Sequence, residues 1–162
     1  RHGQEVYENP SPGNKQGGIT TLEDKSLGCT QKGGTAEVRD VLSYCEPVTE
    51  KGLNLVQGPG NDLCAITALM ASGAQMVLFT TGRGTPVGAP IPTVKVSTNT
   101  PLSEKKRNWI DFNAGILAQG ADMQETTEVF FKKLLAIASG EQTQSEKHDY
   151  REIAIFKDGV TL

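Results

Sequence analysis

The sequence holds little of what several protein classes depend on. Histidine occurs twice and cysteine three times, with no His and Cys spacing typical of a self-contained zinc site. The cysteines, Cys29, Cys45 and Cys64, are odd in number and widely spaced, which favours free thiols in a reducing cytoplasm over a disulfide framework. We expect them to lie in helices as small core residues.

Long hydrophobic runs and an excess of basic residues are missing as well. No stretch approaches the roughly 20 apolar residues of a membrane-spanning helix, and no secretory signal is present. The net charge of −3, with no basic stripe, argues against nucleic acid as a partner. We therefore expect neither a membrane nor a nucleic acid as partner. The composition is that of a globular protein, with 36% hydrophobic and 22% charged residues.

The start of the chain is interpreted as a linker. The first residue is Arg1 rather than Met, and residues 1–18 are polar and rich in Gly, Pro and Asn. We expect residues 1–18 to connect to a missing upstream region. Residues 19–162, the length of one ordinary domain, are expected to form a single C-terminal α/β domain.

Capping and stop signals predict the helices. Thr20-x-x-Glu23 and Thr21-x-x-Asp24 resemble capping boxes, so a helix is expected to begin near Thr21 and to stop by Gly33-Gly34. Thr35 is expected to cap a second helix with Val38, Val41 and Leu42 on one face. Further helices are expected from Asn61 to Gly73, from Ser103 through Trp109, and over about Gln124–Ala138.

Short apolar or alternating runs predict strands at Leu53–Val56, Met76–Phe79, Thr93–Ser97 and Glu152–Phe156. The continuous run Met76–Phe79 is typical of a strand buried on both faces. Strands that alternate with helices predict an α/β fold with a mostly parallel sheet flanked by helices, in a Rossmann-like layer architecture. We expect Met76–Phe79 and Thr93–Val96 in its core.

The loop that follows Met76–Phe79 is the strongest candidate for a ligand site, because ligands gather at the carboxyl ends of strands in such sheets. Glycines let backbone N–H groups approach an anion, and the Arg83 guanidinium matches a carboxylate with two parallel hydrogen bonds. The alternative is a tight turn with a surface arginine. The candidate substrate-binding residues of the loop are Thr80, Thr81, Gly82, Arg83, Gly84 and Thr85.

Two weaker candidates lie elsewhere. The Gly-rich segment Gly13–Thr21 leads into a helix N-terminus, which favours anions, so Asn14, Thr20 and Thr21 are further candidates for substrate binding. Glu23 and Lys25 in the first turns of that helix are the candidate acid and base; the alternative is a flexible linker, a cap and solvated charges.

Asp111 and Asn113 would share one face of an extended segment. Their oxygens suit a hard cation, so they are weak candidates for metal ligands. An Asx turn ahead of a helix is at least as good an interpretation.

Four blocks of the sequence, in this order, resemble the C-terminal region of the altronate/galactarate dehydratase family. They are Gly13–Gly28, Phe79–Pro86, Pro92–Asn99 and Asp111–Gly115. The ending, Arg151–Leu162, is similar to that of the altronate members in particular. The resemblance covers nearly the whole chain.

This resemblance implies a cytoplasmic hydro-lyase of bacterial hexuronate catabolism, whose altronate members convert D-altronate to 2-keto-3-deoxy-D-gluconate and water. It implies a divalent metal, typically Fe(II), and N-terminal and middle regions that are missing here. The expected partners are a sugar acid, those missing regions and further copies in a homo-oligomer. Since no metal cluster is evident, the ligands are expected partly or wholly from the missing region, and the isolated fragment is expected to be inactive. The alternatives are a galactarate dehydratase and a structural or dimerising module that braces an upstream active site.

Overall fold

The computed structural model describes residues 10–155, which divide into two compact units. Unit 1 holds residues 10–73 and 154–155, and unit 2 holds Ala74–Ile153. Both contain helices and parallel strands, so the α/β prediction is confirmed, although the strands form two small sheets instead of one. No helix within residues 10–155 is both long and apolar enough to cross a lipid bilayer.

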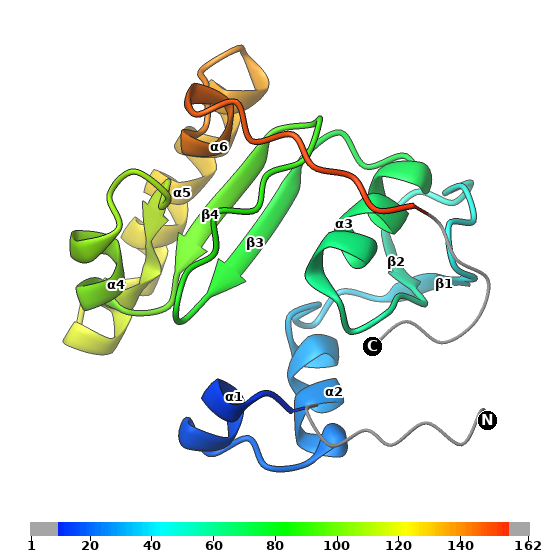
Figure 1. Cartoon of the computed structure of the whole chain (residues 1–162), viewed down its shortest axis with the longest axis horizontal. Helices are drawn as coiled ribbons and strands as arrows, with labels where there is room; N and C mark the ends of the chain where they lie inside the picture. Colours follow the sequence, from blue (N-terminus) through cyan, green and yellow to red (C-terminus); the bar gives the residue numbers. More distant parts are fainter. Residues whose placement is uncertain (1–9, 156–162) are drawn as a thin grey trace. The chain divides into compact units, whose positions relative to one another are not determined.

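Unit 1 contains a two-stranded parallel sheet and three helices (Figure 1). Its elements are α1 (Pro12–Gln16), α2 (Leu22–Gln31), β1 (Val38–Leu42), β2 (Leu53–Val56) and α3 (Asp62–Ala71). Thr21 caps α2 by accepting the Asp24 N–H at 3.2 Å, and Asn61 caps α3 by accepting the Cys64 N–H at 3.2 Å, as predicted. Helix α1 lies within the segment that we interpreted as a linker.

Unit 2 is built around a three-stranded parallel sheet in the order β3-β4-β5. Its elements are β3 (Val77–Thr81), β4 (Thr93–Ser97), α4 (Thr100–Lys105), β5 (Phe112–Asn113), the 3-10 helix η1 (Ala114–Gln119), α5 (Met123–Ala138) and α6 (Gln144–Lys147). The central strand β4 is buried along its whole length.

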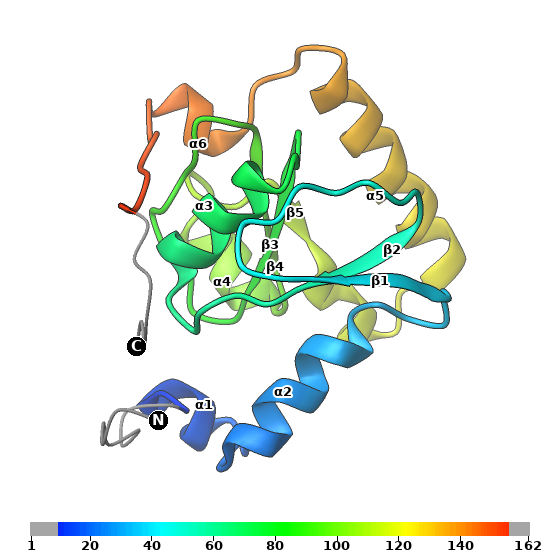
Figure 2. The same ribbon diagram turned by 90° about the vertical axis from the view of Figure 1, so that its right-hand side faces the viewer.

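Side chains alternate between the two faces of β4. On one face, Val94 and Val96 pack against Ile137 of α5, and Phe112 and Phe130 join this core with ring centroids 4.7 Å apart. Figure 2 shows α5 running alongside the sheet. The prediction that Thr93–Val96 lies in the core is confirmed.

Three local predictions were wrong. The segment expected to be a helix after Thr35 is strand β1, because parallel hydrogen bonding to β2 replaces the weak helical signal of Val38 and Val41. Helix α4 begins before Ser103, with Asn99 as its cap. Residues 151–155 form no strand, although the Glu152 N–H donates to Gly88 O at 2.9 Å; Phe156 lies outside the described residues.

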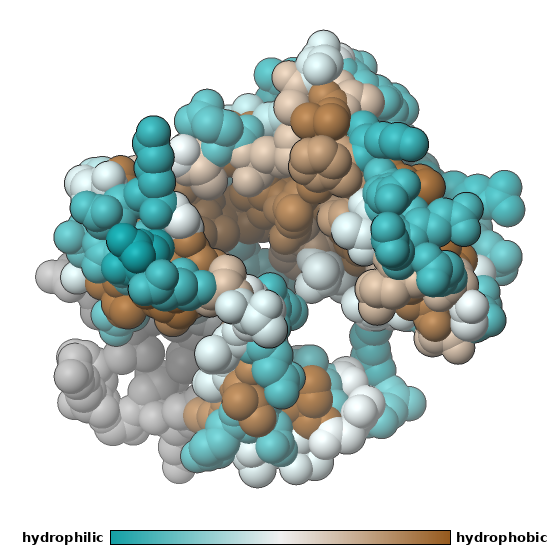
Figure 3. Space-filling model, turned by 180° about the vertical axis from the view of Figure 1, so that it is seen from behind, coloured by the Kyte–Doolittle hydropathy of each residue, from teal (hydrophilic) through white to brown (hydrophobic). Residues whose placement is uncertain are grey.

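Two predictions about burial were also wrong. Leu78 is 49% exposed, so β3 is not buried on both faces. All three cysteines are free thiols, but none is fully buried: Cys29 is exposed, and Cys45 lies in a turn with φ of 64° rather than in a helix. Hydrophobic side chains are visible at the surface of the molecule among hydrophilic ones (Figure 3).

Candidate functional site

The carboxyl ends of the three strands of unit 2 form a row of polar residues. Thr81, Ser97 and Asn113 end β3, β4 and β5, and the parallel register pairs Thr81 with Ser97 and Ser97 with Asn113. The Ser97 hydroxyl donates to Asn113 Oδ1 at 3.2 Å. Ligands of open α/β sheets bind at this edge, so the row, with the loops that follow it, is the candidate site.

The loop after β3 is held by the loop after β4. The Thr98 N–H donates to Thr81 O at 3.0 Å, and the Asn99 side-chain amide donates to Gly82 O at 2.9 Å. Within the loop, Thr81 Oγ1 accepts the Gly84 N–H at 2.9 Å. Gly84 has φ of +83°, a left-handed conformation that disfavours any side chain at this position. These contacts give the loop a defined backbone.

The remaining predicted residues of this loop differ in exposure. Arg83 and Thr80 are exposed, whereas Thr85 is half-buried and its hydroxyl oxygen accepts the Val87 N–H at 3.5 Å. Arg83 is therefore an exposed residue on a loop whose backbone is held by Thr98 and Asn99. This is an arrangement that can bind an anionic group without reorganising.

Asn113 belongs to the same edge. Its side-chain amide donates to Thr100 Oγ1 at 3.1 Å, and its Oδ1 accepts the Gly115 N–H at 3.0 Å, which is the Asx turn considered as the alternative to metal binding. Gly115 is in tight contact with the backbone of Asn99 and Thr100, where a Cβ atom would clash. The structure thus brings Asn113 together with the loop Thr80–Thr85, through residues 99 and 100.

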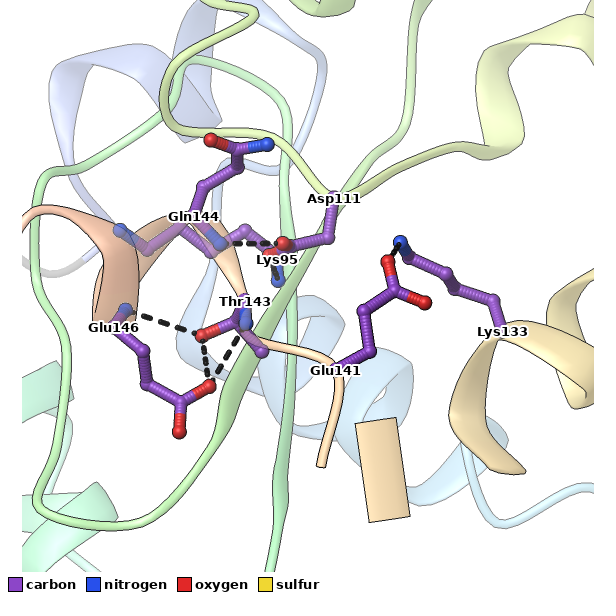
Figure 4. Close-up of polar contacts among 7 residues, drawn as sticks. All are labelled: Lys95, Asp111, Lys133, Glu141, Thr143, Gln144 and Glu146. Atoms are coloured by element: carbon purple, nitrogen blue, oxygen red, sulfur yellow. Dashed lines mark hydrogen bonds and ion pairs between the residues drawn. The ribbon is translucent and has the colours of Figure 1, made fainter. Parts of the chain in front are cut away.

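Asp111 acts as a clamp between β4 and α6 (Figure 4). Its Oδ2 accepts the Lys95 N–H at 2.8 Å and its Oδ1 accepts the Gln144 N–H at 2.7 Å. Burial raises the pKa of Asp111, while these two backbone hydrogen bonds act in the opposite direction. Each carboxylate oxygen thus accepts one backbone N–H group. Metal ligation by Asp111 and Asn113 stays a prediction.

Lys95 is the residue that the sequence analysis missed. Its side chain is fully buried, and Nζ has no hydrogen-bond partner within the described part of the chain. Nζ lies 5.7 Å from the ring centroid of Tyr150. Burial lowers the pKa of Lys95, and the carboxylates of Asp111 and Glu152 oppose this shift. The available signal was a lysine in the middle of a strand predicted to be in the core.

The other predicted site residues lie in unit 1. Asn14 forms a capping box with Ser11 in α1, and the Thr21 hydroxyl caps α2. Thr20 and Glu23 are exposed. Lys25 is half-buried and lines a cavity of about 470 Å³ together with Ser26, Cys29, Val56 and Gly58 among others. The acid, base and substrate roles assigned to these residues stay predictions.

No group of three or more His, Cys, Asp or Glu side chains that suits a metal ion occurs among residues 10–155. The donor set of this part of the chain therefore does not by itself fit a bound divalent metal.

Comparison with known proteins identifies the family of the chain. It is 58% identical to altronate dehydratase of Escherichia coli and 60% identical to that of Bacillus subtilis, over 99% and 100% of its length. It is 37% identical to the galactarate dehydratase (L-threo-forming) of Escherichia coli over 91% of its length. The chain spans about a third of the length of these relatives: 32%, 33% and 29%. The profile of a family described as D-galactarate/altronate dehydratase, C-terminal, matches residues 1–161, so the chain belongs to this family.

Proposed function

We propose that this chain is the C-terminal part of an altronate dehydratase, a hydro-lyase that converts D-altronate to 2-keto-3-deoxy-D-gluconate and water in hexuronate catabolism. The observation that carries the proposal is the identity of 58% and 60% to two altronate dehydratases over essentially the whole chain. The identity of 37% to a galactarate dehydratase makes that activity the second candidate. Assaying the full-length enzyme on both sugar acids decides between them, since turnover of galactarate without altronate contradicts the first choice.

The proposed chemistry needs three kinds of group. A base removes the proton beside the carboxylate, positioned donors stabilise the enediolate that forms, and an acid protonates the departing hydroxyl. At the carboxyl edge of unit 2, Arg83 presents a permanently charged guanidinium on a loop held by Asn99 and Thr98. We assign Arg83, with Gly82 and Gly84 beside it, to the substrate carboxylate and to the charge that grows there.

The neutral donors and acceptors of the same loop suit the hydroxyl groups of a sugar acid. Thr80 and Thr85 flank Arg83, and Thr81 anchors the loop to the sheet. In unit 1, Asn14, Thr20 and Thr21 are separate candidates for binding sugar-acid hydroxyl groups. Of the two acid and base candidates, Lys25 lines a cavity whereas Glu23 is exposed, so Lys25 is favoured for contact with substrate.

A divalent metal, Fe(II) in the proposal, has to find its ligands largely outside this part of the chain. Among residues 10–155, no cluster of three suitable side chains exists, and both oxygens of Asp111 accept backbone N–H groups. The proposed enzyme works in the cytoplasm as a homo-oligomer. Sedimentation of the full-length protein tests the oligomeric state.

Substitution of Arg83 tests the substrate role. In the full-length enzyme, Arg83→Ala is expected to lose about 2–4 kcal/mol of transition-state stabilisation, the scale of one positioned charge-stabilising donor. This corresponds to a roughly thirtyfold to thousandfold fall in kcat/KM. Arg83→Lys is expected to remain impaired, because it keeps the charge but lacks the planar pair of donors.

The matched control is Arg107→Ala, an exposed arginine of the same unit. It is expected to leave kcat/KM within about twofold of the parent, as for a surface substitution away from any site. If Arg83 is instead a structural clamp for its loop, Arg83→Ala lowers the melting temperature while kcat/KM of the folded fraction stays near the parent value. That result excludes the substrate role.

A further inference from the structure

One face of strand β3 is left open in unit 2. The parallel register pairs Leu78 with Val94 and Thr80 with Val96, so all four side chains point to the face on which α5 packs. Val94 is 0% and Val96 6% exposed, but Leu78 is 49% exposed. Helix α5 therefore covers the central strand and leaves the edge strand uncovered on the same face.

The widths of the elements explain this difference. Neighbouring strands lie about 4.8 Å apart, whereas helices packed side by side need about 10 Å each. One helix therefore covers about two strands, and a three-stranded sheet needs a second element on each face. Within residues 74–153, α5 is the helix that packs on the face of Val94 and Val96. The position over β3 lacks an equivalent element in unit 2.

Helix α5 has a second apolar side as well. Phe130 and Ile137 face the core. Phe131 and Leu135, four residues apart, lie along another side of the helix and are 59% and 52% exposed. A surface helix with one partner normally places polar residues there. We define Leu78, Phe131 and Leu135 as the α5–β3 surface.

We propose that the α5–β3 surface is covered by the part of the full-length protein that precedes this chain. The curated relatives are about three times as long as the chain, which makes up 32% and 33% of their length, and the family is described as C-terminal. Parallel sheets are normally buried on both faces, and exposed apolar patches beyond a few hundred Å² mark interaction sites. The additional two thirds of such a protein can therefore supply the apolar surface that covers it. This inference does not depend on which sugar acid is turned over.

Photo-crosslinking in the full-length enzyme identifies the occupant. Phe131→p-benzoylphenylalanine carries the reactive group on the α5–β3 surface. Val129→p-benzoylphenylalanine is the matched control, because Val129 is 53% exposed on the same helix but points about 200° away from Phe131. The expected result is a product that migrates as a monomer and links position 131 to a peptide of the preceding region, with a yield at least fivefold above that of the control.

Every other outcome overturns the proposal. A product of dimer size shows that a second copy covers the surface, and a link to residues 10–73 shows that unit 1 covers it. A yield no higher than that of the Val129 variant shows that the surface is open to solvent. An active altronate dehydratase with any of these results retains the proposed function while losing this inference, so the two fail separately.

A second measurement does not rely on the photoreactive group. Phe131→Glu in the full-length enzyme is expected to shorten the half-life in limited proteolysis at least tenfold, because the carboxylate cannot pack against an apolar neighbour. Val129→Glu is expected to change it less than twofold. Equal effects of the two substitutions contradict a docked surface around Phe131.

Discussion

The two units use the same elements but bury them to different degrees. In unit 2, all five residues of β4 are buried, because β3 and β5 flank the strand and helices cover it. In unit 1, β1 has one buried residue, Leu42, and β2 has none, because each is an edge strand of a two-stranded sheet. The burial of a strand therefore depends on the number of its neighbours more than on its own apolar residues.

The largest expected effect tests this difference with one substitution made in each unit. Ile137 in unit 2 and Ile66 in unit 1 are both 3% exposed. Ile→Ala in a core typically lowers the free energy of unfolding by about 2–5 kcal/mol, according to the cavity that remains. We expect Ile137→Ala near the upper end and Ile66→Ala near the lower end, because Ile137 packs into the cluster of Val94 and Val96. Hydrogen exchange resolved by peptide measures both, and a reversed ranking contradicts the comparison.

Lys95→Met tests the polar side of the core of unit 2. The substitution removes the cost of burying an unpaired ammonium group, so the free energy of unfolding is expected to rise by about 1–4 kcal/mol at neutral pH. The exposed Lys132 on α5 provides the control Lys132→Met, for which we expect a change within about 0.5 kcal/mol.

The pH dependence of this gain has a defined sign. Burial lowers the pKa of Lys95 in the folded protein below its ordinary value of 10.5. Between the two pKa values, the unfolded chain holds more protons on Lys95 than the folded chain, so the stability of the parent rises with pH. The advantage of Lys95→Met should therefore shrink as the pH approaches 10.5. Urea unfolding of both proteins from neutral to alkaline pH measures this; a constant advantage shows that Lys95 does not titrate with a lowered pKa.

Gly115→Ala is expected to disturb the carboxyl edge of unit 2. The added methyl group would clash with the backbone of Asn99 and Thr100, which cannot move without shifting the hydrogen bonds to Gly82 and Asn113. We expect a loss of about 1–3 kcal/mol in unfolding free energy, as for overpacked sites. Thermal unfolding checks this, and a reduced kcat/KM in the full-length enzyme is expected to accompany it. A stable variant with parent kinetics would show that this edge tolerates displacement.

The smallest expected effect has the opposite sign and lies in unit 1. Gly28 is inside helix α2, and a Cβ atom there would have open space around it. Gly28→Ala should stabilise the helix by about 0.4–1 kcal/mol by reducing the freedom of the unfolded chain. Slower amide exchange confined to α2 is the expected readout, and destabilisation would show that α2 packs more closely than the structure indicates.

Much of the local structure could be predicted because its causes are local. The caps Thr21 and Asn61, and the glycines at 34, 73 and 140 with positive φ, act within a few residues and set the ends of helices α2, α3 and α5. Predictions failed where the deciding partner was distant in sequence. Strand β1 depends on β2, and the position of residues 151–153 depends on Gly88.

The candidate site also has features that follow from local sequence and features that depend on residues distant in sequence. A Gly-rich loop with Arg83 after an apolar strand indicates a ligand site from the sequence, because strand ends and glycines have general consequences for anion binding. The contacts that hold this loop, from Thr98 and Asn99, and the clamp of Asp111 on Lys95 and Gln144 span 16 to 33 residues of sequence. No local pattern encodes such distances.

The sequence by itself determined the α/β class, most helix ends and the family, since these follow from short-range preferences and from similarity along the chain. Only the tertiary structure decided that the strands divide into two sheets, that Lys95 is buried without a hydrogen-bond partner among the described residues, and that Leu78 and Phe131 stay exposed. The physical reason is that burial is a property of neighbours, and neighbours are brought together by pairing across the chain.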